Sequence, residues 1–302
     1  VLFRSRQGQP YPGDQRSFCQ QQLAILQSHQ LELLAGFEIE WVLGSLTGEG
    51  IAGGPYGADR LIQGLDYLSS LGDALDAAGI GWLQLHPEYG PSQFELSLAP
   101  LDPLAAADQL VLAKLVILRV SQRFGWRCSF SPVVDPALVG NGGHLHISAR
   151  HRGEPLFAGA PDLSAAGAGV VAALLAELPA LLPLACPLAI SYQRLAPSHW
   201  SALYQAWGLE NRETALRLIP SGLRQAGVIA QANLELKVAD LAANPYLLLG
   251  GVMAVIADGL NKPRSLPPPV QGDPSRLPAE EQPPRLAANL EQAAAEIGRA
   301  HV

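Results

Sequence analysis

The sequence of 302 residues has few charges, few lysines and few cysteines. Only 16% of the residues are charged and 48% are hydrophobic, so the chain can bury enough apolar surface to fold, and extensive disorder is excluded. The 27 acidic residues outnumber the 20 basic ones, and the net charge of −7 argues against nucleic-acid binding. The widely spaced cysteines exclude a disulfide framework and a zinc cluster and predict a reducing, cytoplasmic setting: Cys19, Cys128 and Cys186.

Both common phosphate-binding motifs are also absent. The chain contains no GxxxxGK[ST] and no GxGxxG that opens a helix, which excludes a P-loop and a Rossmann site. Phosphate recognition would then depend on arginines, whose guanidinium groups bind phosphates and carboxylates in a forked geometry. Arg194, Arg212 and Arg217 are the candidates, and the alternative for each one alone is an ordinary surface charge.

One long apolar run covers residues 169–190, with Glu177 as its single charge. Its length is typical of a membrane span, but it contains three prolines and lacks an aromatic belt and a basic flank. We therefore predict a buried helix with a broken C-terminal half, and no membrane association. At the chain ends, residues 1–5 and 296–302 look like translated adapter sequence, so we expect them to lie outside the fold.

The spacing of apolar residues and of glycine and proline predicts helices and short strands interspersed along the chain. No regular βαβ rhythm is present, which favours an α+β fold over a doubly wound parallel sheet. The expected helices cover 17–35, 58–78, 103–124, 243–260 and 285–295. The expected strands cover 37–43, 82–88, 93–98, a pair around 140–143, and 232–238, and extended loops cover 44–57 and 263–284.

Several of these strands are apolar on one face and carry acidic groups and histidines on the other, because residues of one parity share a face. The polar faces hold Glu38 and Glu40, Glu95, His144, His146 and Ser148, and Asn233, Glu235 and Lys237, with His86 leading into Glu88. For any one strand, a solvated face is the alternative interpretation. Taken together, neighbouring carboxylates need cations among them, and oxygen-rich ligands suit Mg²⁺ or Mn²⁺.

The segments that contain these residues resemble the motifs of the glutamine synthetase family. They are Glu38-Ile39-Glu40, His86-Pro87-Glu88 followed by residues 90–95 (GPSQFE), residues 140–148 (GNGGHLHIS), residues 191–197 (SYQRLAP), residues 207–212 (WGLENR), and residues 235–246 (ELKVADLAANPY). All six occur in the family's order over about residues 10–290. The order makes the resemblance specific, whereas one such match would be weak.

The resemblance implies the catalytic domain of the glutamine synthetase/guanidino kinase-like fold, a curved antiparallel sheet (split barrel) packed with helices. Residues 17–295 would be this domain, truncated at its C-terminus, and residues 6–16 the linker from a missing N-terminal β-grasp domain. The family assembles as a ring, so we expect a homo-oligomer, a dodecamer of two hexamers, for the full-length protein. We expect the fragment itself to be inactive.

The same resemblance implies two divalent ions, Mg²⁺ or Mn²⁺, and ATP as co-substrate. The first ion would be held by Glu40, Glu88 and Glu95, and the second, which bridges the ATP phosphates, by Glu38, His144 and Glu235. ATP would also contact His146, Ser148, Asn233 and Arg217. The substrate-binding residues would be Gly140, Asn141, Gly142, Arg194, Trp200 and Lys237. Arg194 would hold the glutamate carboxylate and Trp200 would face the amine. Arg212 and Arg217 would stabilise the transferring phosphoryl group, with Arg194 as the third catalytic arginine.

The departures from the family pattern concern the acceptor and the carboxylate substrate. Trp200 stands where glutamine synthetases have a glutamate that takes a proton from ammonium, and tryptophan offers an apolar wall or a cation–π face instead. Lys237 and Asn233 each replace an arginine, and lysine lacks the bidentate fork. We therefore predict an ATP-dependent ligase that makes a γ-glutamyl amide with an organic amine. Ammonia as acceptor, in a true glutamine synthetase, and a non-catalytic regulatory homologue remain the alternatives.

Overall fold

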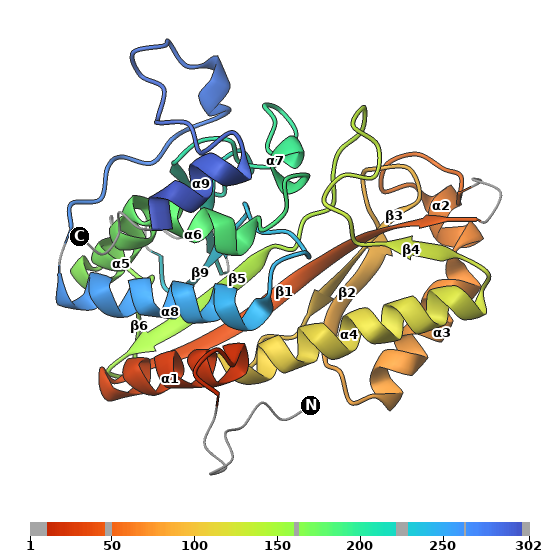
Figure 1. Cartoon of the computed structure of the whole chain (residues 1–302), viewed down its shortest axis with the longest axis horizontal. Helices are drawn as coiled ribbons and strands as arrows, with labels where there is room; N and C mark the ends of the chain where they lie inside the picture. Colours follow the sequence, from red (N-terminus) through yellow and green to blue (C-terminus); the bar gives the residue numbers. More distant parts are fainter. Residues whose placement is uncertain (1–10, 46–49, 160–162, 222–228, 263, 298–302) are drawn as a thin grey trace.

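The computed structural model describes residues 11–45, 50–159, 163–221, 229–262 and 264–297 (Figure 1). The predicted tail 1–5 and most of 296–302 fall outside these ranges, as does the first half of the predicted linker 6–16. The helices are α1 (Gln15–Ser28), α2 (Ala58–Gln63), α3 (Leu65–Ala77), α4 (Pro103–Arg123), α5 (Ala165–Ala176), α6 (Leu178–Ala185), α7 (Ser191–Arg194), α8 (Pro245–Asn261) and α9 (Leu290–Ile297). The strands are β1 (Leu31–Gly44), β2 (Trp82–Pro87), β3 (Gln93–Leu98), β4 (Arg127–Ser129), β5 (Leu145–His151), β6 (Glu154–Pro155), β7 (Trp207–Leu209), β8 (Leu216–Pro220) and β9 (Ala232–Leu236).

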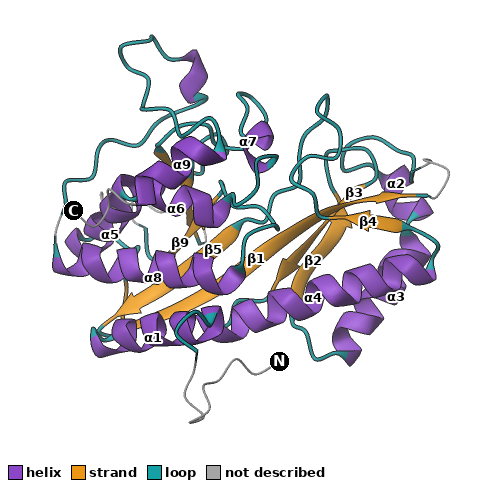
Figure 2. Ribbon diagram, viewed as in Figure 1, coloured by secondary structure: helices purple, strands orange, loops and turns teal. Residues whose placement is uncertain are grey.

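The strands form one nine-stranded sheet with the order β2-β3-β1-β5-β9-β8-β7, in which β4 pairs with β1 and β6 with β5. Every pair is antiparallel except β7–β8, which is parallel, so the predicted antiparallel sheet is in fact mixed. The α+β class is confirmed. In Figure 2 helices and sheet form separate layers, and α1, α4 and α8 lie along one side of the strands.

The long central strand β1 explains how the sheet both builds the core and carries the site. Its odd-numbered side chains, from Leu31 to Leu43, are buried against the helices. Trp41 is among them, and its indole donates to the Tyr67 hydroxyl at 3.1 Å. The even-numbered face carries Glu38, which is half-buried, and Glu40, which is buried, and both lie on the side away from this apolar core. Burial of the odd face therefore fixes the direction in which both carboxylates point.

Four features differ from the sequence-based expectation. The predicted helix 17–35 is wrong in its second half, because α1 ends at Ser28 and β1 begins at Leu31 after Gln30, whose φ is +58°. The expected helix 58–78 breaks at Gly64 into α2 and α3. The final helix, expected over 285–295, is Leu290–Ile297, and the glycine cluster 140–143 is followed by β5 but not preceded directly by a strand.

The apolar run is a bent helix pair, as predicted from its prolines. α5 and α6 meet at 66°, and Pro183 lies inside α6. Most side chains of both helices are buried in the core. Among the described residues, no single helix is long and apolar enough to cross a membrane, although this bent pair passes the same test when its halves are combined.

Candidate active site

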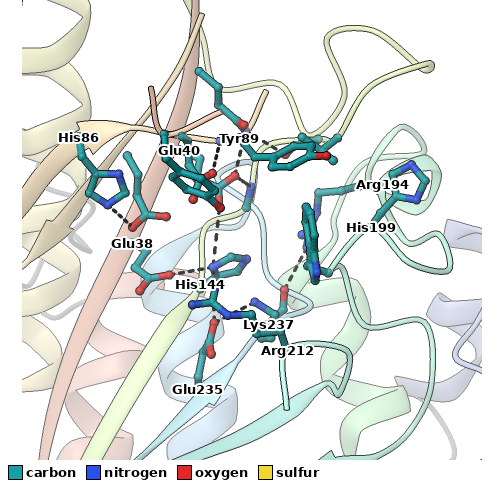
Figure 3. A pocket seen from close by; sticks show the side chains of 18 of the residues that line it. Glu38, Glu40, His86, Tyr89, His144, Arg194, His199, Arg212, Glu235 and Lys237 are labelled. Carbon is teal, nitrogen blue, oxygen red and sulfur yellow. Dashed lines mark hydrogen bonds and ion pairs between the residues drawn. The ribbon is translucent and has the colours of Figure 1, made fainter. Parts of the chain in front are cut away.

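A cavity of about 510 Å³ opens on the polar face of the sheet, where the strands that carry the predicted acidic residues lie side by side (Figure 3). Its walls include Glu38 and Glu40 of β1, His86 of β2, Glu95 of β3 and His144. Arg212, Arg217, Glu235 and Lys237 close it from the other side. Residues from 38 to 237 are therefore brought to one place by the pairing of neighbouring strands, as their shared parity predicted.

Glu38 and Glu235 form the centre of one cluster with two histidines, His144 just before β5 and His146 on it. His144 Nδ1 lies 2.9 Å from Glu38 Oε2 and 3.5 Å from Glu235 Oε1, and His146 Nε2 lies 3.1 Å from Glu38 Oε1. One ligand atom each from Glu38, His146 and Glu235 lies within 4.8 Å of the others. Both histidines thus reach the pair of carboxylates, although the resemblance assigned His144 to the ion and His146 to the nucleotide.

The pKa values in this cluster are set by burial and by two cations, Lys237 and protonated His146. Burial opposes ionisation of Glu235, but Lys237 and the two histidines lower its pKa to about 2. Burial and the charge of Lys237 lower the pKa of His144 to about 4, so this imidazole is neutral and able to bind a metal ion. Burial also disfavours a charged His146, yet the carboxylate of Glu38 raises its pKa to about 9.

The other predicted ion site, around Glu40, Glu88 and Glu95, has too little positive charge to offset the burial of Glu40 and Glu95. Glu40 and Glu95 face each other across the β1–β3 register, and both are buried. Burial and then Glu95 raise the pKa of Glu40 to about 8, while burial raises that of Glu95 despite a contact to His86 at 3.4 Å. Glu88 lines the same cavity. In the described part of the chain, no other three His, Cys, Asp or Glu residues place ligand atoms within 4.8 Å of one another. Buried carboxylates with raised pKa values nevertheless fit a divalent ion.

Gln93 is a residue of the site that the sequence did not single out. Its amide nitrogen donates to Glu40 Oε2 at 3.1 Å, to the Gly140 carbonyl at 3.0 Å and to Asn141 Oδ1 at 2.9 Å. Asn141 in turn is fully buried and donates to the Ser131 carbonyl at 2.8 Å. The Asn141 side chain therefore holds the glycine segment in place from inside the protein. Its position in the motif suggests contact with substrate, but its buried side chain does not.

The three predicted arginines differ in what they do in this structure. Arg217 Nη1 donates to Glu235 Oε2 at 3.1 Å, and its buried Nε has no hydrogen-bond partner among the described residues. Arg212 is exposed at the cavity wall. Arg194 is buried, and its Nη2 donates to the backbone carbonyls of residues 237–239.

Arg194 thus holds the chain behind the cavity, where its side chain also touches the glycine segment. A Cβ at Gly140 would lie 2.7 Å from Arg194 Cγ, so a glycine is needed there for close approach. If Arg194 binds a substrate carboxylate as predicted, it would do so through Nη1 and Nε, because Nη2 is bound to the backbone. On the nucleotide side, His146 Nδ1 lies 2.9 Å from Asn233 Oδ1, and Ser148 is half-buried further along β5.

Three exposed aromatic rings form a wall at the cavity beside Glu88. The Trp200 and Tyr89 rings meet edge to face with centroids 4.8 Å apart, and Tyr56 lies 6.3 Å from Tyr89. The exposed fractions are 37% for Trp200, 40% for Tyr89 and 57% for Tyr56. The family pattern drew attention to Trp200, whereas the two tyrosines were missed. We refer to Tyr56, Tyr89 and Trp200 as the aromatic wall.

Comparisons with known proteins agree with this geometry. Residues 12–302 match the family described as glutamine synthetase, catalytic domain. The chain belongs to the glutamine synthetase family. It is 41% identical over 285 residues to a γ-glutamylpolyamine synthetase, GlnA3, of Streptomyces coelicolor, covering 90% of this chain and 60% of that protein. It is 30% identical over 259 residues to a glutamine synthetase of Thermococcus kodakarensis, covering 84% of this chain and 57% of the relative.

Solved structures give the same family assignment. A structure described as a novel glutamine synthase homologue has a TM-score of 0.84 and 33% identity, and the match covers 98% of this chain and 67% of the other. A GmaS complex with ADP has a TM-score of 0.85 and 26% identity, covering 97% and 69%. The chain spans about 60% of the length of the curated relatives that it matches. The predicted family and fold are confirmed.

The raised pKa of Glu40 predicts how this glutamine synthetase family site responds to pH and to divalent ions. Folded Glu40 keeps its proton up to about pH 8, against an ordinary value of 4.5, so its contribution to stability is present below pH 4.5 and lost as pH rises through 8. An ion bound by Glu40 would displace that proton. We therefore expect Mn²⁺ affinity to rise about tenfold per pH unit between about pH 6 and pH 7.5.

Calorimetric titration with Mn²⁺ at several pH values, in buffers of different ionisation enthalpy, measures both the affinity and the protons released. The matched control is Glu32→Gln, since Glu32 is an exposed glutamate on the same strand. It should leave the pH slope unchanged, whereas Glu40→Gln should flatten it. An affinity independent of pH in the unaltered protein would contradict the prediction.

Proposed function

We propose that the protein is an ATP-dependent ligase that activates glutamate as γ-glutamyl phosphate and joins it to an organic amine. The observation that carries the proposal is the aromatic wall, which lies in the same cavity as the acidic cluster and arginines typical of the glutamine synthetase family. The relative named as a γ-glutamylpolyamine synthetase supports an amine acceptor. Glutamate, ATP and the amine are the proposed substrates.

The carboxylates and histidines of the cavity fit two Mg²⁺ or Mn²⁺ ions by their donor chemistry. We assign the first to Glu40, Glu88 and Glu95, and the second to Glu38, Glu235 and His144, with His146 next to it. When bound, these ions would neutralise phosphate charge and make the γ-phosphate a better electrophile. Arg212 and Arg217 would add charge-assisted hydrogen bonds to the transferring phosphoryl group.

The aromatic wall distinguishes an organic amine from ammonia. A protonated alkylamine is attracted to the faces of tryptophan and tyrosine and also gains from contact of its methylene groups with the rings. Ammonium lacks those methylene groups. Trp200 cannot accept a proton as a carboxylate would, so the wall favours acceptors that gain binding energy from apolar and cation–π contacts.

The proposed setting of the enzyme follows the family. We propose a homo-oligomeric ring, a dodecamer of two hexamers, on the support of the structural relatives, and a cytoplasmic location. Two of the three cysteines are buried and all three are free thiols, which suits a reducing compartment. Residues 17–295 are proposed as the catalytic domain and residues 6–16 as the linker that leads into it from a β-grasp domain.

An acceptor screen tests this function. ADP release by the full-length protein is measured with glutamate and ATP in the presence of ammonia, a polyamine, ethanolamine or an aromatic amine. We expect kcat/KM for the preferred organic amine to exceed that for ammonia by about tenfold or more, a difference of ~1.4 kcal/mol that burial of about two methylene groups against the rings can supply. Equal or faster turnover with ammonia would identify a glutamine synthetase instead. ATP binding without turnover on any acceptor would identify a non-catalytic homologue.

A further inference from the structure

Arg60 is a buried arginine whose guanidinium group hydrogen-bonds to the protein backbone. It lies on the short helix α2, and only 1% of its surface is exposed. Nη1 donates to the carbonyls of Glu88 and Gly90, both at 2.6 Å, and Nη2 donates to the carbonyl of Gly53 at 2.7 Å. Burial lowers the pKa of Arg60, because the charged guanidinium group is desolvated there.

The three carbonyls belong to the two segments that carry the tyrosines of the aromatic wall. Glu88 and Gly90 flank Tyr89 on both sides, so Arg60 fixes the peptide groups before and after this ring's residue. Gly53 lies three residues before Tyr56 in the glycine-rich loop. The loop approaches α2 so closely that a Cβ at Gly53, where φ is +123°, would lie 2.7 Å from the backbone nitrogen of Arg60.

The two segments also contact each other on the side that faces the cavity. The backbone nitrogen of Tyr56 donates to the Glu88 carbonyl at 3.4 Å, and the backbone nitrogen of Tyr89 donates to the Glu88 carboxylate. The rings of Tyr56 and Tyr89 then pack edge to face. A shift of either segment would therefore move Tyr56, Tyr89 and the Glu88 carboxylate together.

We propose that Arg60 is a positioning residue for the amine acceptor, which holds Tyr56 and Tyr89 in the geometry that lets them bind it beside Trp200. This inference rests on the proposed function. The planar guanidinium group suits the task because its donors have a fixed geometry and can reach two segments at once. A lysine ammonium is a point charge on a flexible stem and cannot reproduce that geometry.

Arg60→Lys and Arg60→Met separate this role from one in stability alone. We expect KM for the organic amine to rise about tenfold with Arg60→Lys and further with Arg60→Met, while KM for ATP changes less than about twofold. Arg16→Lys is the matched control, since Arg16 forms an exposed ion pair with Asp108 at 2.7 Å, and it should leave all KM values unchanged. An equal rise of KM for amine and ATP, or no rise, would overturn the proposal.

Amide hydrogen exchange gives a second measure that needs no turnover. Arg60→Lys should speed exchange in residues 50–57 and 88–93 and leave α4 and α8 at the rate of the unaltered protein. Uniformly faster exchange, or unchanged exchange in both segments, would show that Arg60 does not position them. If the unaltered protein turned over no amine, the proposed function would fail, and the exchange result would still decide whether Arg60 holds the two segments.

Discussion

Replacing Glu235 by glutamine is expected to lower the free energy of unfolding by about 3 kcal/mol and to abolish turnover. The Glu235 side chain is 1% exposed and accepts from Arg217 Nη1 and Lys237 Nζ, each at 3.1 Å. Glutamine has nearly the same shape but no charge, so both cations would lose their buried counterion. Breaking a buried ion pair from one side costs more than the pair itself contributes, because an uncompensated charge stays behind.

Urea unfolding followed by circular dichroism measures this effect. Asp258→Asn is the matched control, because Asp258 also pairs with two cations, Lys262 at 2.8 Å and Arg264 at 3.0 Å, but at the surface. That variant should lose less than about 1 kcal/mol. If Glu235→Gln were as stable as Asp258→Asn, burial of the cations around Glu235 would not require its negative charge. A double variant, Glu235→Gln with Lys237→Met, should recover part of the lost stability.

The position of Glu235 shows why parity of strand residues was a good guide to the site. The alternation of apolar and polar residues in 37–41 and 233–238 is a property of the sequence, and it fixed which side chains leave the core. Neighbouring strands then brought Glu38, His146 and Glu235 into one cluster. Where alternation failed as a signal, the fold prediction failed too: Leu31 and Leu34 fit a helical spacing but lie on β1.

The parts of the site that sequence did not reveal depend on contacts between segments. Gln93 and Arg60 act through backbone carbonyls and side chains far away in the chain, and no spacing within one element encodes such a contact. The same is true of Arg194, whose motif matched the family but whose Nη2 is taken up by the backbone of residues 237–239. Tyr56 and Tyr89 lie in irregular segments, where periodicity gives no information.

Trp200 is expected to control the choice of acceptor, because it contributes the aromatic face closest to Tyr89. Trp200→Ala should lower kcat/KM for an organic amine by about tenfold, corresponding to ~1.4 kcal/mol of lost contact between the ring and the methylene groups of the amine, with most of the change in KM. Turnover with ammonia should change less than about twofold, since ammonium has no alkyl group to lose contact. The ratio of the two kcat/KM values is the quantity to measure.

Two further variants at the same position show which property of the indole matters. Trp200→Phe keeps an aromatic face and should retain at least half of the preference for the organic amine, whereas Trp200→Glu should shift the preference towards ammonia by restoring a proton acceptor. Tyr11→Ala removes another exposed aromatic ring, one that does not line the cavity, and should change neither value. An equal loss of kcat/KM for amine and ammonia in Trp200→Ala would mean that the ring supports the active-site structure in general. If Trp200→Ala lowers kcat/KM for the amine alone and Trp200→Phe keeps that value, the ring contacts the acceptor.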